Sequence, residues 1–257
     1  MEFKDKTFSN RLNFIKQHVT NLWHPHSTPI YYYTPHDITH SQGVIDSLYQ
    51  LIPEEKHCEM GDEEWFLLLS AAWLHDIGMI PGLFKGDKYP KKSDYDNIRA
   101  DHHLRSKEYV LKKQNELGLT VDEADLIGIL CKYHRRREDI ETCPDIKVTT
   151  SLKLIVLASY LRLADAIHID NSRVSEYESL YNMYLVEGMP LDSEFHWLRS
   201  FWIREIKPDP QKATIEIQFR FKENIEIDDI DLLIKLTLDD VSEELDSCKN
   251  VLIKEGI

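Results

Sequence analysis

The chain has 257 residues, a formal net charge of −14 at pH 7, and a composition that is 42% hydrophobic and 30% charged. This length suits one domain with an appendage or two small domains, and the negative charge disfavours nonspecific binding to nucleic acid or to an anionic membrane. Four cysteines without a CxxC pair predict neither a zinc finger nor a disulfide framework, and they favour the reducing cytoplasm. We expect no secretion signal and no transmembrane segment, since the longest apolar stretch, WFLLLSAAWL, is too short to cross a bilayer.

Most of the chain up to about residue 172 carries apolar residues at helical spacing. Thr120 and Glu123 form a capping box at the start of one predicted helix. The segment 24–36 contains three prolines and is a predicted loop, and the segment 79–96 is predicted to be a loop or a lid. The predicted helices cover residues 8–23, 37–52, 61–77, 96–116, 122–137 and 151–169.

The pattern changes after residue 172. A helix is predicted near 174–187, followed by a β-hairpin in which FWIREI and ATIEIQFRF alternate apolar and polar residues on either side of KPDPQK. The last segment, residues 228–253, is an acidic amphipathic helix. We therefore predict a mainly α protein: a helical domain over residues 1–172, and a small α+β extension over residues 173–257 that packs on it.

Histidine and aspartate side chains recur near the ends of the apolar helices. Their spacing of 26 to 35 residues equals about one helix plus one connection, so they can converge at one depth of a helical bundle. Burying an aspartate among leucines and alanines is costly unless a cation or a donor compensates it. Imidazole and carboxylate together suit iron, manganese, zinc or nickel. The residues of this pattern are His40, His75, Asp76, His102 or His103, His134 and Asp165.

With this pattern the chain resembles the HD superfamily of metal-dependent phosphohydrolases. The superfamily signature is a histidine, an adjacent His-Asp pair and a distant aspartate. Here these residues stand as His40 in THSQGV, His75 and Asp76 in WLHDIG, and Asp165 in RLADA. The resemblance covers about residues 31–172 and implies the helical bundle of an HD domain.

Members of the superfamily that bind two metals have two further histidines between the His-Asp pair and the last aspartate. His134 stands in one of these places, and either His102 or His103 in the other. His102 is preferred because Ser106, four positions later, resembles the spacing in binuclear relatives. The resemblance thus implies two divalent ions, which would be manganese, iron, nickel, zinc or magnesium.

The resemblance also implies a division of labour. Asp76 would bridge both metals, and small Gly78 would permit close backbone approach beside it. A bridging water, acidified by both cations, would attack phosphorus. His40, His75 and Asp165 would complete the first metal site, and His102 and His134 the second. The residues to which we assign catalytic roles are Asp76, His102 and His134.

Several cations near these residues are candidate phosphate contacts, because guanidinium groups match phosphate oxygens well. The alternative for the arginines is ordinary ion pairing within a helix. His36, one turn before His40, is either a substrate contact, a residue that supports a ligand, or a plain turn histidine. His168 and His196 receive no assignment. The candidate substrate contacts are Arg105, Arg137, Arg162 and His36.

The predicted function is that of a divalent-metal-dependent phosphohydrolase or phosphodiesterase acting on a nucleotide or another phosphate ester. The alternatives are an HD-type diiron oxygenase with the same ligands, and a non-catalytic regulatory or partner-binding module. The intact ligand set weighs against the second alternative. The expected partner is a small phosphorylated substrate in the cytoplasm. Nucleic acid is disfavoured, no membrane is expected, and a homo-oligomer stays open.

Overall fold

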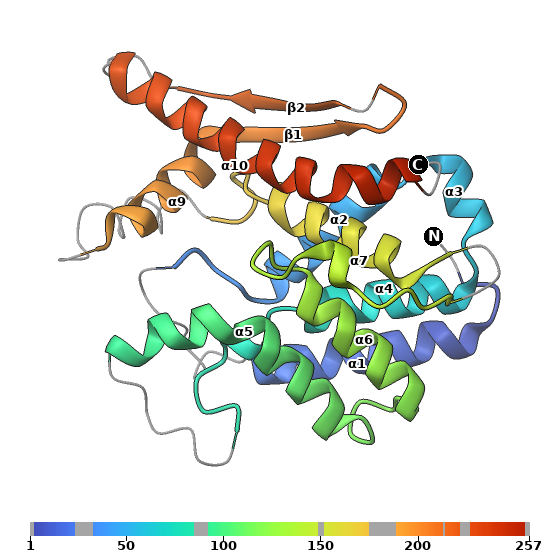
Figure 1. Cartoon of the computed structure of the whole chain (residues 1–257). Coiled ribbons are helices and arrows are strands. Elements are labelled where there is room, and N and C mark those ends of the chain that lie inside the picture. Colours follow the sequence, from blue (N-terminus) through green and yellow to red (C-terminus); the bar gives the residue numbers. More distant parts are fainter. Residues whose placement is uncertain are drawn as a thin grey trace.

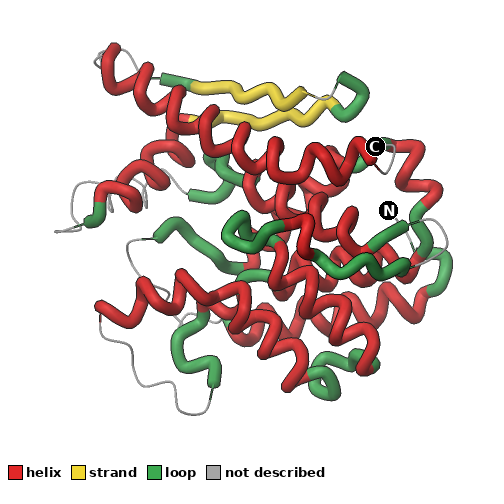
Figure 2. The backbone as a smooth tube through the Cα atoms, in the orientation of Figure 1, coloured by secondary structure: helices red, strands yellow, loops and turns green. Residues whose placement is uncertain are grey.

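The structure is a computed structural model, and it shows a mainly helical molecule with a two-stranded antiparallel sheet along one side (Figure 1). Helix dominates the course of the backbone (Figure 2). The predicted fold class, a helical bundle with a small α+β extension, is confirmed. The structure describes residues 3–23, 33–84, 92–148, 152–174, 189–212, 214–221 and 227–254.

Helices joined by loops and short 3₁₀ turns make up the first part of the chain. The predicted capping box is confirmed: the Glu123 amide donates to the Thr120 hydroxyl over 3.2 Å, and the Thr120 amide donates to the Glu123 carboxylate over 2.8 Å. The elements are α1 (Lys6–Leu22), α2 (Ile38–Leu51), α3 (Glu54–Glu59), α4 (Asp62–Leu74), η1 (Ile77–Met79), α5 (Lys92–Lys113), α6 (Val121–Tyr133), η2 (Ile140–Thr142) and α7 (Leu154–Ile167).

Helix α4 lies at the centre of the bundle. Every residue from Glu64 to Leu74 is buried, as expected for a helix that is apolar on all sides. Helices α1, α2, α6 and α7 contact it. Helix α7 is almost as apolar and packs against both α2 and α6. The ends of α2, α4, α6 and α7 therefore meet inside the core, where polar side chains at these ends are shielded from water.

Several helix boundaries differ from the sequence prediction by three or four residues. The largest differences are that α5 begins at Lys92 rather than at residue 96, and that α6 ends at Tyr133 rather than at residue 137. The early end of α6 has a tertiary cause. The buried Arg162 guanidinium donates hydrogen bonds to the carbonyl oxygens of Tyr133, Arg135 and Glu138 over 2.6 to 3.0 Å. The chain therefore turns around this side chain instead of continuing the helix.

The extension contains α9 (Leu191–Trp202), β1 (Ile203–Asp209), β2 (Thr214–Phe219) and α10 (Ile227–Lys254). The predicted hairpin and acidic helix are confirmed, but the first strand starts at Ile203, because Phe201 and Trp202 still belong to α9. Helix α9 was not predicted, although Pro190 followed by Asp192 and Glu194 is a recognisable helix start. The helix predicted near 174–187 lies outside the described residues.

Helix α10 packs along α7, and a small apolar cluster joins the extension to the end of α7. The cluster consists of Ile167, Ile169, Ile203, Ile206 and Val241. Figure 1 shows the hairpin and α10 along the same side of the molecule, and β1 also contacts α2 of the bundle. A domain boundary at residue 172 stays a prediction. Among the described residues, the helices are either too short or too polar to span a bilayer.

Candidate metal centre

The predicted ligands come from five helices and stand at helix ends or face the core. His40 lies in the first turn of α2, where the Asp37 side chain accepts the amide of His40 and so starts the helix. His75 caps the end of α4, and Asp76 follows it directly. His102 lies within α5 and His134 caps the end of α6. Asp165 lies in the last turn of α7.

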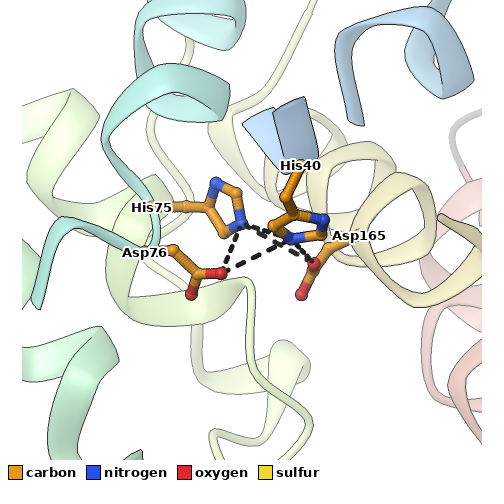
Figure 3. Close-up of side chains that lie close together, drawn as sticks. All are labelled: His40, His75, Asp76 and Asp165. Carbon is orange, nitrogen blue, oxygen red and sulfur yellow. Dashed lines mark hydrogen bonds and ion pairs between the residues drawn. The ribbon is translucent and has the colours of Figure 1, made fainter. Parts of the chain in front are cut away.

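Four of these side chains form the first group, in which His40 and His75 point toward two carboxylates (Figure 3). Nε2 of His40 lies 2.9 Å from Oδ1 of Asp165 and 3.4 Å from Oδ2 of Asp76. Nε2 of His75 lies 3.3 Å from Oδ2 of Asp76 and 3.6 Å from Oδ1 of Asp165. Four donor atoms within 4.8 Å of one another leave room for one cation at their centre.

The second group lies on the other side of Asp76. Oδ1 of Asp76 is 3.2 Å from Nε2 of His102 and 3.7 Å from Nε2 of His134. The two imidazole nitrogens are 3.0 Å apart. Asp76 therefore turns one carboxylate oxygen toward each group, which is the arrangement expected of a ligand shared by two metals.

Hydrogen bonds orient three of the imidazoles in the same way. Nδ1 of His75 lies 2.8 Å from the carbonyl oxygen of Ala72, three residues earlier. His102 and His134 make the equivalent contacts, each over 2.6 Å, with the carbonyls of Arg99 and Cys131. Because a carbonyl only accepts, Nδ1 carries a proton in each of the three rings, and Nε2 faces the centre. In the neutral form of the ring this arrangement leaves the Nε2 lone pair for a metal, which is the tautomer that a metal ligand requires.

His40 is oriented by another histidine. Its Nδ1 lies 2.8 Å from Nδ1 of His168, whose Nε2 lies 3.2 Å from the Ser172 hydroxyl. That hydroxyl donates to Asp170 over 2.6 Å. The sequence pattern predicted no role for His168, although its position three residues after Asp165 at a helix end is a usable signal. A Cβ on Gly43 would lie 2.0 Å from the His168 ring, so glycine is required there.

The charges of the centre depend on one another. Burial raises the pKa of Asp76, but the His75 imidazole and hydrogen bonds from His40 and His75 outweigh burial and hold this pKa well below its usual range. Asp165 is held ionised in the same way, mainly by hydrogen bonds from His40 and His75. Burial lowers the pKa of His134 to about 3, with help from His102 and His75. The centre thus offers ionised carboxylates and at least one neutral imidazole, which is the ligand chemistry of a divalent cation.

Backbone packing sets the distance between the two groups. A Cβ on Gly78 would lie 2.1 Å from the carbonyl oxygen of His102 and 2.7 Å from the amide of Ser106. The predicted close approach at Gly78 is thus confirmed, and it lets α5 rest directly on η1. The Gly78 amide also donates to the Ser106 hydroxyl over 2.9 Å, which ties α5 to the His-Asp turn.

The structure decides between the two candidate histidines on α5. His102 belongs to the second group, whereas Nε2 of His103 lies 3.1 Å from Oε1 of Glu138 and outside both groups. The prediction of His103 as a possible metal ligand is therefore corrected in favour of His102. The physical reason is that neighbouring helical residues point about 100° apart, so only one of them can face the centre.

The predicted substrate contacts differ in their surroundings. The prediction of Arg162 as a substrate contact is corrected, because this side chain is buried and its guanidinium donates to the carbonyl oxygens at the end of α6. Arg105 donates to the carbonyls of Gly78 and Ile80 over 2.8 and 3.1 Å and so supports η1. Arg137 is exposed and lies 3.7 Å from Asp101. His36 stands beside the centre, with its ring centroid 5.7 Å from that of His40.

A mainly helical bundle with buried His/Asp groups that can hold metal ions defines an HD-type domain. The family comparison agrees with this class: the HD-CE family model matches residues 30–247. The chain therefore belongs to the HD-CE family. The match includes the bundle and most of the extension. No curated protein and no solved structure matches the chain.

Proposed function

We propose that the protein is a divalent-metal-dependent phosphohydrolase or phosphodiesterase that acts on a nucleotide or another phosphate ester. The observation that carries the proposal is the position of Asp76, whose two carboxylate oxygens face two separate histidine groups. Paired cations about 4 Å apart are a recurring arrangement in phosphoryl chemistry. Membership of an HD-type family supports the same reading.

The donor set fits two divalent ions. His40, His75, Asp76 and Asp165 would hold the first, and Asp76, His102 and His134 the second; manganese, iron, nickel, zinc and magnesium are candidates. When bound, such a pair supplies an activated water nucleophile and neutralises charge on the phosphate oxygens.

The residues of the chain contribute position and environment. The carbonyls of Ala72, Arg99 and Cys131 orient three imidazoles so that Nε2 of each ring faces the centre. The apolar residues of α4 and α7 behind the centre exclude water from that side, so electrostatic interactions there are strong. Ligands held in this way need little reorganisation when substrate binds.

The site favours a small phosphorylated substrate over a nucleic acid. The net charge of −14 repels long polyanions, whereas local arginines near the centre can hold a single small anion. The cysteines described in the structure are free thiols, which suits the reducing cytoplasm proposed as the location.

The test combines metal analysis with a substrate screen. Full-length protein purified without oxygen is analysed for bound metals and then assayed with nucleoside mono-, di- and triphosphates and cyclic nucleotides, with Mn²⁺, Fe²⁺, Ni²⁺, Zn²⁺ or Mg²⁺ added. We expect about two metals per chain and metal-dependent release of phosphate or a nucleotide product. Oxygen consumption without phosphate release would overturn the proposal in favour of the diiron oxygenase. Neither reaction with any metal would favour a binding module.

A further inference from the structure

Three arginines and a histidine from three parts of the chain gather next to the metal centre. They are Arg99 on α5, Arg173 after α7, and His196 and Arg199 on α9; we call them the arginine cluster. His196 lies between two of the arginines. Its Nε2 is 3.4 Å from Nη2 of Arg99, and its Nδ1 is 2.9 Å from Nη2 of Arg199. The extension therefore reaches the bundle at this point.

The hydrogen bonds inside the cluster cannot all be satisfied. A neutral imidazole has one accepting nitrogen and one N–H, and guanidinium nitrogens only donate. His196 can therefore accept from Arg99 or from Arg199 but not from both, and a protonated ring could accept from neither. Burial lowers the pKa of His196 to about 2, with Arg199 and Arg99 acting in the same direction. The ring is neutral, and one arginine contact is left without an acceptor.

The positive charge of the cluster is only partly balanced. Nη1 of Arg199 lies 2.8 Å from Oδ2 of Asp240. Arg199 is nevertheless only 8% exposed, and its buried Nε has no hydrogen-bond partner among the described residues. Arg99 stacks over the Tyr33 ring, with 4.4 Å between the guanidinium carbon and the ring centroid. Placing like charges in a partly buried region is unfavourable unless an anion compensates them.

Arg173 has only neutral acceptors in the described part of the chain. Its guanidinium donates to the carbonyls of Pro35 and His168, each over 3.1 Å. Neither Arg173 nor Arg99 has a carboxylate within ion-pair distance there, so Asp240 is the cluster's only close counter-charge within the described residues. Among the described residues, the three arginines thus have one ion pair, and Asp165, Asp76 and Asp37 act on Arg173 only from beyond ion-pair distance.

The cluster is attached to both halves of the metal centre. The backbone carbonyl of Arg99 accepts from Nδ1 of His102, a ligand of the second group. Arg173 donates to the carbonyl of His168, whose ring contacts His40 in the first group. An anion held by the cluster would therefore lie beside whatever the metals bind.

We propose that the arginine cluster is a subsite for a second phosphate group, and that the substrate carries at least two linked phosphates. Guanidinium groups hold phosphate oxygens through paired, charge-assisted hydrogen bonds, and an anion there would also satisfy the unpaired donors of Arg199 and Arg99. This inference rests on the proposed phosphohydrolase function for the first phosphate at the metals. It gives α9 of the extension a role in selecting the substrate.

The test uses two stable probes and the full-length protein as purified. Methylenediphosphonate presents two linked phosphonates and is not hydrolysed, whereas methylphosphonate presents one. Their dissociation constants are measured by titration calorimetry. We expect the wild-type protein to bind the diphosphonate at least about tenfold more tightly, since the second phosphonate adds charge-assisted hydrogen bonds to the cluster. Equal affinity for both probes would overturn the proposal.

Variants separate the cluster from the metals. Arg99→Met keeps the backbone carbonyl that orients His102, and Arg199→Met tests the buried member, with circular dichroism to check folding. In each of these variants, the ratio of the dissociation constants of methylphosphonate and methylenediphosphonate should fall close to one. Arg204→Met, an exposed arginine on β1, is the matched control and should keep the preference. If both cluster variants bind like the control, the subsite does not exist.

An activity assay distinguishes the two proposals. Metal-dependent hydrolysis that is equally fast in wild type and Arg99→Met, with nucleoside diphosphates no better than monophosphates, would refute the subsite and leave the phosphohydrolase intact. A cluster-dependent preference for the diphosphonate without hydrolysis of any nucleotide would support the subsite as an anion-binding site and refute the phosphohydrolase.

Discussion

The metal centre and the arginine cluster are adjacent, and both bury charged side chains. In the metal centre the carboxylates of Asp76 and Asp165 alternate with imidazoles, so each charge has a close partner. In the arginine cluster three guanidinium groups have, within the described part of the chain, one carboxylate at ion-pair distance and a neutral imidazole ring. The two regions are therefore complementary: the first is suited to cations and the second to an anion. Substitutions that change one region at a time test this difference.

The largest effect is expected for Asp76→Asn. The amide keeps the shape of the side chain but removes the charge shared by both groups. We expect metal content to fall from about two ions per chain to below one and activity to fall at least about 100-fold, measured by elemental analysis and phosphate release. The control is Asp46→Asn, an exposed carboxylate on α2, which should behave as wild type. Full metal content in Asp76→Asn would remove the basis for a shared ligand.

His134→Ala tests the second group alone. The first group keeps all four of its donors, so metal content should fall from about two ions per chain to about one, and activity should fall at least about tenfold. His103→Gln is the matched control, because its ring faces Glu138 rather than the centre. Unchanged metal content in His134→Ala would mean that the centre holds one ion and that His134 only shapes its surroundings.

Gly78→Ala tests how tightly the two groups are held together. The added methyl group would lie 2.1 Å from the carbonyl oxygen of His102, so η1 and α5 must move apart. We expect a loss of about 2 kcal/mol in the free energy of unfolding and weaker binding at the second group, measured by chemical denaturation and metal titration. In Gly128→Ala the nearest atom to the new Cβ is on the flexible stem of Lys107 at 3.3 Å, and the next atoms lie at an ordinary contact distance of 3.7 Å, so no loss is expected. Equal stability of both variants would contradict the close packing.

The smallest effect concerns Glu244 on α10, a carboxyl group outside both regions whose side chain is 19% exposed. Burial raises its pKa to about 7, although Arg136 and Arg162 act against this. A carboxyl group with a raised folded-state pKa stabilises the fold below its ordinary value of 4.5, and this contribution is lost as the pH rises through about 7. Glu244→Gln avoids this loss. At pH 8 its free energy of unfolding should therefore exceed that of wild type by about 1 kcal/mol, and the difference should vanish near pH 5.

Thermal unfolding of both proteins between pH 5 and pH 8 provides the measurement. Glu243→Gln is the control, because its side chain is 61% exposed and it should follow the wild-type pH dependence. Parallel curves for Glu244→Gln and wild type would show that Glu244 is ionised throughout. This carboxyl group would then resemble those of the metal centre, which stay ionised because imidazoles face them.

The sequence by itself determined the helical fold class and the order of the candidate ligands along the chain. Helical periodicity is local, and a histidine or an aspartate at the end of an apolar helix is costly enough to mark a site. His40, His75, Asp76, His134 and Asp165 could therefore be read from the chain before their positions were known. The capping box and the hairpin also depend on neighbouring residues and were predictable for the same reason.

Only the tertiary structure decided which side chains face the centre and which partners they meet. The choice of His102 over His103 depends on how α5 rotates against η1, and Arg162 proved structural because α6 ends around it. The meeting of Arg99 with Arg199 depends on α9, which reaches the bundle from the far end of the chain. Contacts between segments so distant in sequence are set by packing, and no local pattern of residues encodes them.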